Sequence, residues 1–189
     1  MEFYEVVRNR RAVRKYKPDM VPEEVIYKIL DAANWAPSGM NTQSWEFLVV
    51  SGDKLKAMGE SYARVCEPIA AKMEPDKGKA YLDAAGKYFG APVVIVALAP
   101  AGENETMRKM HLEGACAAFQ NLLLAAYAEG LGSCWMTGPL QEEAFLRELL
   151  SIGDDKQIVA VTPIGYPEYL PKAPPRLDPD LKQKVTWFK

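Results

Sequence analysis

The first residues whose types and spacing could do chemistry form a short cationic run near the N-terminus. Arg8, Arg10, Arg11, Arg14, Lys15 and Lys17 lie within ten residues of one another. Like charges at this density repel unless an anion or several carboxylates neutralise them. The run therefore predicts a phosphate-binding segment, and the open alternative is a basic face exposed to water.

Two later segments offer hydrogen-bonding groups to a ligand. The loop from Ser38 to Ser44 carries amide and hydroxyl side chains, which can bind the polar edge of a ligand. In the loop from Met136 to Gly138, backbone N–H groups could face a ligand. Ordinary turn chemistry remains the alternative for the first loop. Together with the basic run, the two loops suit a phosphorylated cofactor that carries the chemistry itself.

Other chemistries lack the residues that they need. Gly130-Leu131-Gly132 begins like a dinucleotide fingerprint, but it follows a helix and lacks the third glycine. There is no Walker A loop, and no spacing of carboxylates identifies an acid and a base. His111 is the only histidine, which argues against a Ser-His-Asp triad or a multi-histidine metal site. We expect His111 to be solvated near a helix start, and we expect no catalytic side chain and no metal site.

Composition limits the class of protein. A chain of 189 residues, 49% of them hydrophobic, can bury one core, so a single domain over residues 1–189 is expected. The net charge of -2 gives no general attraction to nucleic acid or to acidic membranes. Cys66, Cys116 and Cys134 are odd in number and widely spaced, which fits reduced thiols. With no signal-like apolar region at the N-terminus, a cytoplasmic protein without membrane segments is expected.

The elements that must position these residues follow from hydrophobic periodicity. The longest predicted helix runs from Leu112 to a stop at Gly130, with one apolar face and a second stripe of small residues from Gly114 to Ala128 where another helix could approach. Other helices are expected at 3–8, from Pro22 to Pro37, at 53–65, 81–88 and 141–150. Strands are expected at 45–50, 93–99, 131–135 and 157–164, and 72–78 is expected to be a mobile loop.

The C-terminal segment differs in character. Five prolines between Pro167 and Pro179 predict an extended arm that forms no packed element of its own. Trp187 and Phe188, at its end, are large apolar groups, so the arm is expected to dock on another surface.

Three segments together resemble the signature segments of the FMN-dependent nitroreductase family: Arg10–Tyr16, Trp35–Trp45 and Gly130–Trp135. Their order and spacing match over nearly the whole chain. The resemblance implies an α+β, three-layer sandwich with a central, mostly antiparallel sheet flanked by helices. It also implies an intertwined homodimer with two FMN sites at the subunit interface, and an arm, residues 167–189, that docks on the partner subunit.

The resemblance also implies which residues bind the cofactor. Arg10, Arg11 and Arg14 would contact the phosphate, ribityl chain and pyrimidine edge of FMN, and Ala12 falls in the same segment. Pro37, Ser38, Gly39 and Asn41 would come from the partner subunit, with Gln43 supporting their loop. Met136, Thr137 and Gly138 would lie against the isoalloxazine, and Arg176 would close over the phosphate.

Three positions depart from the family pattern. Ala12 replaces a common serine, Ser44 replaces the usual proline, and Pro174 stands where some members have a second phosphate-binding lysine. The expected consequence is looser retention of FMN.

The implied activity is an FMN-dependent oxidoreduction. NAD(P)H would give hydride to the flavin and leave, and a nitroaromatic, quinone or similar electron-poor molecule would then take the electrons in a ping-pong cycle. The segment 61–89, with Tyr62, Tyr81, Tyr88 and Phe89, would shape the pocket or belong to the core. The alternatives are a flavin-storage protein, another flavin reaction such as dehalogenation, flavin fragmentation or dehydrogenation, and a basic interaction domain without flavin.

Overall fold

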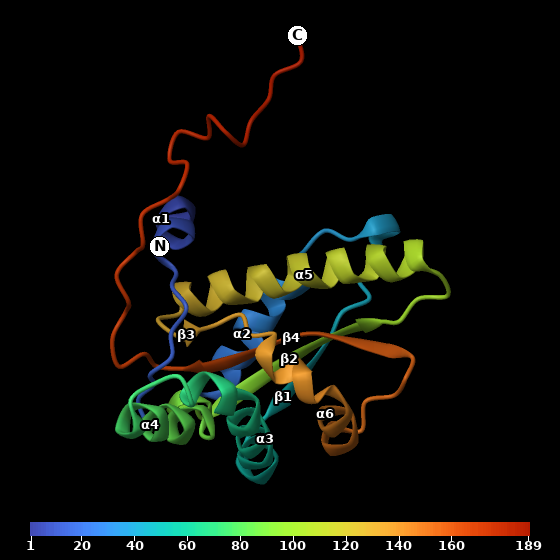
Figure 1. Cartoon of the computed structure of the whole chain (residues 1–189). Coiled ribbons are helices and arrows are strands. Elements are labelled where there is room, and N and C mark those ends of the chain that lie inside the picture. The colour runs from blue at the N-terminus through green and yellow to red at the C-terminus, as the bar shows by residue number, and fades with distance from the viewer.

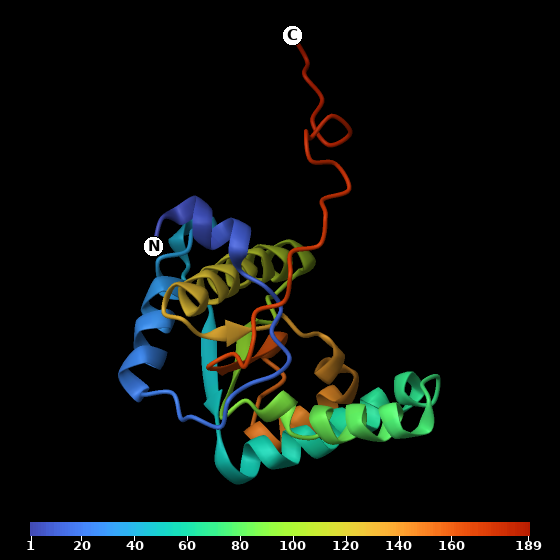
Figure 2. The ribbon, with the colours of Figure 1, turned by 90° about the vertical axis from the view of Figure 1, so that its left-hand side faces the viewer.

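A computed structural model describes residues 1–189 and shows a central four-stranded antiparallel sheet between two layers of helices (Figures 1 and 2). Along the sheet the strand order is β1-β2-β4-β3. The strands are β1 (Glu46–Val50), β2 (Val93–Pro100), β3 (Gly132–Ser133) and β4 (Lys156–Gly165). The α+β sandwich expected from the sequence is confirmed.

Strand β2 shows why the sheet needs helices on both faces. Side chains alternate between the two faces of a strand. Val93, Ile95, Ala97 and Ala99 pack with α2 (Glu23–Asn34) and α5 (Glu105–Ala128). Val94, Val96 and Leu98 pack instead with residues of α3 (Gly52–Ala70) and α6 (Glu143–Leu150). Two cores therefore form, one on each face, which is why the sequence of β2 is continuously apolar.

Helix α5 is the long helix expected from the sequence, and it begins earlier than predicted. Its N-cap is Asn104, whose side chain accepts a hydrogen bond from the Met107 N–H over 2.9 Å. The stripe of small residues meets elements of the same chain: Asn121 donates to the Ala32 carbonyl of α2 at 3.3 Å. Leu112, the first residue of the predicted helix, is exposed.

Helix α4 (Pro75–Ala85) corrects the prediction of a mobile loop at 72–78. Pro75 occupies the first turn, where its missing N–H is tolerated, and Asp76 complements the helix dipole. The helix predicted at 81–88 is the end of α4, which stops at Ala85; Tyr88–Gly90 then forms a short 3-10 helix, η2. Helix α3 continues through Pro68 to Ala70, beyond the predicted end.

The remaining elements are short. Helix α1 (Phe3–Asn9) lies over one end of α5, and 3-10 helices η1 (Gly39–Asn41) and η3 (Gly138–Glu142) interrupt two loops (Figure 1). None of the helices combines the length and apolar character needed to cross a bilayer.

Residues 167–189 form no helix or strand and run away from the body of the molecule (Figure 2). The arm starts beside the basic segment, because Glu168 donates its N–H to the Lys15 carbonyl at 3.1 Å and pairs with the Lys15 ammonium at 3.0 Å. Trp187 and Phe188 are 79% and 95% exposed. The end of the arm therefore docks on no surface of its own chain.

Candidate functional site

The arginine segment is held as an extended strand-like stretch against β3. The Val13 N–H donates to the Ser133 carbonyl at 2.9 Å, and Ala12 forms a parallel bridge with Ser133. Tyr16 adds an anchor, since its buried hydroxyl donates to the Val13 carbonyl at 2.9 Å. This register fixes Arg10, Arg11 and Arg14 around the end of the short strand.

The arginines near β3 have no carboxylate partners. Lys15 pairs with Glu168, but no ion pair within the chain involves Arg10, Arg11, Arg14 or Arg176. Burial lowers the pKa of Arg10; the nearby Cys134 acts in the opposite direction, and repulsion from Arg11 and Arg176 lowers it further. The structure thus brings Arg176 of the arm to the predicted cluster, which is a concentration of positive charge that suits a phosphate.

Two buried polar atoms at this site have no partner. Arg11 donates through Nη1 to the Arg8 and Arg10 carbonyls, at 2.7 and 2.6 Å, but its Nε has no acceptor. The Ser133 hydroxyl, beside Ala12, is also buried without a partner. Such groups are uncommon in folded proteins and indicate a missing ligand or water.

The loop after β3 adds a free backbone donor. Met136 is buried and exchanges two backbone hydrogen bonds with Val161 of β4, at 2.9 and 3.0 Å. Thr137 is exposed, and its N–H donates no hydrogen bond within the chain. Gly138 lies against the Tyr62 ring, which a Cβ at this position would approach to 3.2 Å. Thr137 therefore offers a backbone donor at the surface, and Gly138 beside it packs against Tyr62.

Cys134 lies between the arginines and this loop. Its N–H donates to Thr162 Oγ1 at 3.1 Å. Burial raises the pKa of the Cys134 thiol, although the neighbouring Arg14 and Arg10 act to lower it. The thiol is accordingly protonated at neutral pH and serves as a small buried group rather than a nucleophile.

The aromatic residues of segment 61–89 form two groups: some belong to the hydrophobic core, and others are candidates for the wall of the substrate pocket. Tyr88 and Phe89 are buried. Tyr62 is half-buried and stacks on Tyr88 with ring centroids 5.5 Å apart. Burial and the adjacent Cys66 raise the pKa values of Tyr62 and Tyr81, while Arg14 acts to lower them. Tyr62 and Tyr81 therefore lie near Arg14 as neutral phenols. They are the candidates for the wall of the substrate pocket, which the sequence alone could not distinguish from core residues.

The other predicted half of the site lies elsewhere in the chain. The loop Pro37–Ser44 rests on the N-terminal half of α5, where Gly39 meets Met110, whereas the arginine segment meets β3 beyond the C-terminal end of α5. Figure 1 shows η1 and α1 at opposite ends of this helix. With a rise of 1.5 Å per residue, the separation is about 20 Å. One chain does not bring the two halves together.

The prediction for His111 is wrong. His111 is buried at 9% exposure and its Nδ1 lies 2.8 Å from Ser44 Oγ in a hydrogen bond. It is inside α5, because that helix begins at Glu105. The missed signal was its helical spacing with Ala115, Ala118 and Leu122, which places it on the buried stripe.

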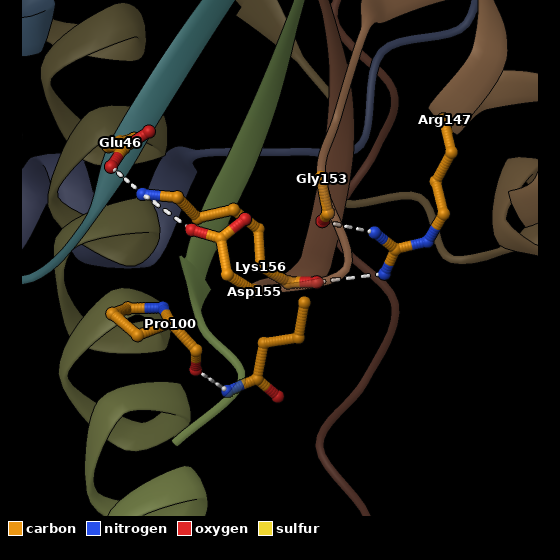
Figure 3. A network of polar contacts seen from close by, with 7 residues as sticks. Glu46, Pro100, Arg147, Gly153, Asp155 and Lys156 are labelled. Atoms are coloured by element: carbon orange, nitrogen blue, oxygen red, sulfur yellow. Dashed lines mark hydrogen bonds and ion pairs between the residues drawn. The ribbon is translucent and has the colours of Figure 1, made fainter. Parts of the chain in front are cut away.

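A second polar cluster, at the opposite end of the sheet, neutralises its own charge (Figure 3). Lys156 pairs with Glu46 and approaches Asp155 within 4.0 Å. Arg147 donates to the carbonyls of Gly153 and Lys156, each at 2.8 Å. These contacts anchor the start of β4. Their complete pairing contrasts with the unpaired arginines near β3.

No group of three or more His, Cys, Asp or Glu side chains is arranged to hold a metal ion. A phosphorylated cofactor fits the arginine site better than a metal ion, because the site combines unpaired guanidinium groups, an orphaned Arg11 Nε and a free Thr137 N–H.

The chain is similar to known proteins over most of its length. A protein named as a candidate NADH dehydrogenase/NAD(P)H nitroreductase from Methanothermobacter thermautotrophicus is 33% identical over 190 residues, covering 99% of this chain and 88% of that protein. The iodotyrosine deiodinase of Thermotoga neapolitana is 32% identical, covering 87% of this chain and 88% of the deiodinase. A candidate nitroreductase from Desulfovibrio desulfuricans, solved in complex with FMN, superposes with a TM-score of 0.75 at 26% identity, covering 97% of this chain and 96% of that one.

The family model described as the nitroreductase family matches residues 7–166. That span contains Arg10–Arg14, the loop Pro37–Ser44 and the β3 loop to Gly138, which are three segments predicted for the site, and it ends before Arg176. This chain belongs to the nitroreductase family.

Proposed function

We propose that this chain is a homodimeric FMN oxidoreductase that uses NAD(P)H to reduce electron-poor small molecules by a ping-pong cycle. The observation that carries the proposal is the group of unpaired arginines, Arg10, Arg11, Arg14 and Arg176, held by the segment that meets β3, together with the free N–H of Thr137 in the loop after β3. The names of the relatives, as NAD(P)H nitroreductase, and the FMN complex of the Desulfovibrio protein support it.

The chain's own residues supply binding and orientation. Arg10, Arg11 and Arg176 neutralise the phosphate, and Arg14 faces the pyrimidine edge, where a cation favours the negative charge that reduction brings. The free Thr137 N–H would help to hold the ring system of the cofactor. FMN held by these residues would supply the two-electron transfer between NAD(P)H and the acceptor.

A second copy of the chain completes the site. Because Pro37–Gln43 and the arginine segment lie at opposite ends of α5, the loop of one protomer serves the arginines of its partner. Pro37, Ser38, Gly39 and Asn41 approach the flavin from there, and Gln43, whose N–H donates to Ser38 Oγ at 3.0 Å, supports the loop. The flavin is then enclosed between two protomers.

The C-terminal arm covers the partner beside β1. Strand β1 is at the free edge of the sheet, and a groove of ≈ 450 Å³ beside it is lined mainly by apolar side chains, among them Met20, Tyr27, Phe47 and Val49. The arm carries exposed Leu177, Trp187 and Phe188. Burying these side chains in the partner's groove removes apolar surface from water on both protomers.

Reductive dehalogenation is the second candidate, because a deiodinase is among the relatives above 30% identity. Both reactions use the same flavin site, so the acceptor must be identified by assay. Halogenated phenols and nitroaromatics, offered as parallel acceptors to the reduced protein, distinguish the two.

The test is an absorbance spectrum of the dimer reconstituted with FMN, followed by anaerobic addition of NADH and then NADPH. We expect bound flavin that is bleached by one donor and recovered by an electron-poor acceptor. Arg14→Ala should weaken FMN binding at least tenfold, whereas Lys79→Ala, which removes an exposed, unpaired cation from α4, should not. Bound flavin that resists both donors would support a storage protein, and a colourless protein would support the basic interaction domain.

A further inference from the structure

The loop before β1 has a backbone shape that needs outside support. Met40, Asn41 and Gln43 have φ values of 53°, 54° and 46°, in the left-handed region, which asparagine tolerates but which is uncommon for Met40 and Gln43. All three side chains are exposed. Residues held in such conformations persist only when their surroundings fix them, and they cluster at functional sites.

Hydrogen bonds inside the loop define its shape but not its position on the molecule. The Asn41 N–H donates to the Ser38 carbonyl at 3.0 Å, and the Gln43 N–H donates to Ser38 Oγ at 3.0 Å. These bonds join loop atoms to one another only.

Helix α5 supplies the position through three contacts. Ser44 Oγ bonds His111 Nδ1 at 2.8 Å. Gly39 lies so close to Met110 that a Cβ would stand 2.5 Å from Met110 Cγ, and a Cβ on Gly114 would stand 3.3 Å from Ser38 Cβ. Only the Ser44–His111 contact is a hydrogen bond. The other two are close van der Waals contacts, which limit how near the loop can come to α5 but do not fix its orientation.

We propose that His111 and Ser44 are positioning residues that clamp the loop Ser38–Gln43 on α5 in the shape it presents to the cofactor site of the partner subunit. The inference rests on the proposed function for the identity of that cofactor. Serine leaves its own φ free, so the bond to a buried ring of α5 is what restrains the last loop residue. His111 is buried and Ser44 is half-buried, which shields their bond from water.

The clamp is tested first without any cofactor, by hydrogen exchange of a peptide covering residues 37–45 in the full-length dimer. We expect Ser44→Ala to speed exchange of the loop amides about tenfold, and Ser44→Thr, which keeps the hydroxyl, to restore the wild-type rate. Ser51→Ala is the matched control, because Ser51 follows the other end of β1, is exposed and makes no side-chain capping bond. Unchanged exchange in Ser44→Ala would overturn the clamp.

A double-mutant cycle separates the clamp from a general packing role. His111→Phe keeps a ring in place without the nitrogen, so Ser44→Ala/His111→Phe should be no worse than either single variant. If the effects of the two single variants on loop exchange simply added in the double variant, Ser44 and His111 would not act through one shared hydrogen bond.

The consequence for the cofactor is measured by FMN titration of the apoprotein. We expect Ser44→Ala to raise the FMN dissociation constant about tenfold, with Ser44→Thr and Ser51→Ala within twofold of wild type. Faster loop exchange with an unchanged FMN constant would overturn the positioning role. A wild-type protein that binds no FMN would refute the proposed function and the cofactor half of this inference, and loop exchange would still decide the clamp.

Discussion

Gly132 and Val13 approach so closely that no side chain fits at position 132. A Cβ there would lie 2.8 Å from both Cβ and Cγ1 of Val13. The contact sets the distance between β3 and the arginine segment, and therefore the place of Arg10, Arg11 and Arg14.

Gly132→Ala should push the arginine segment away from β3. Overpacking in a well-packed core costs about 1–3 kcal/mol, so chemical denaturation should show a loss of free energy of unfolding in this range, and FMN binding should weaken with it. Gly130→Asn is the control, because Gly130 ends α5 with φ +77° and open space around it, where asparagine is tolerated. If Gly132→Ala and Gly130→Asn had the same free energy of unfolding, the close contact between Gly132 and Val13 would not set the position of the arginine segment.

Two tyrosines allow a matched test of buried hydroxyl groups. Tyr88 is fully buried and its hydroxyl has no partner, whereas the Tyr16 hydroxyl donates to the Val13 carbonyl at 2.9 Å. Tyr88→Phe should raise the free energy of unfolding by about 1 kcal/mol, because it removes an unsatisfied polar group. Tyr16→Phe should lower it by about 1 kcal/mol or more, because it leaves a buried carbonyl unpaired. Urea unfolding of both variants measures the difference, and a stabilised Tyr16→Phe would refute it.

The sequence predicted an element of this fold correctly where the element's own residues carry a clear hydrophobic pattern. Strand β2 was predicted correctly, since a run buried on both faces is apolar at every position. The start of helix α4 was missed because the polar run 72–78 was predicted to be a loop, although Pro75 and Asp76 are helix-start residues. His111 was misplaced for the same kind of reason: the start of α5 was set at Leu112 rather than at Glu105.

The site required information that the sequence does not contain locally. The basic segment was identified by its charge, but the nearness of Arg176 to Arg10 depends on how the arm leaves the sheet beside Lys15. The resemblance indicated the loop Pro37–Asn41, yet only the fold shows that α5 holds it away from the arginines of its own chain. The Ser44–His111 bond joins residues that are 67 positions apart, which no periodicity reveals.

The Cys134 thiol should resist alkylation at neutral pH. Burial raises its pKa above the usual value of 9.0, so at pH 7.5 fewer than about 3 in 100 thiols are ionised. The folded state favours the protonated thiol, so its contribution to stability is present below pH 9.0 and is lost as the pH rises through the folded pKa. Arg14→Ala should slow alkylation further, because Arg14 acts to lower this pKa. Mass spectrometry of iodoacetamide adducts across pH 7–10 provides the measurement, and faster alkylation in Arg14→Ala would contradict the prediction.

The apolar end of the arm should control the association of the two protomers. Trp187 and Phe188 are 79% and 95% exposed in the single chain, and fully burying such a side chain contributes about 1.5–3 kcal/mol. Trp187→Ala/Phe188→Ala should therefore weaken the dimer at least a hundredfold, as measured by sedimentation at several concentrations. The control Lys182→Ala/Lys184→Ala changes two exposed arm residues but keeps Trp187 and Phe188. It should leave the dimer intact.

FMN retention should follow the same variants, because the arm also carries Arg176 to the phosphate end of the site. Loss of Trp187 and Phe188 weakens the association of the protomers and also leaves Arg176 less firmly held. FMN should therefore dissociate faster in Trp187→Ala/Phe188→Ala even at concentrations where dimers persist. Arg176→Ala should instead weaken FMN binding while sedimentation shows an unchanged dimer. An anchor variant with wild-type association and wild-type FMN affinity would show that the arm ends in solvent and that the apolar groove beside β1 has another occupant.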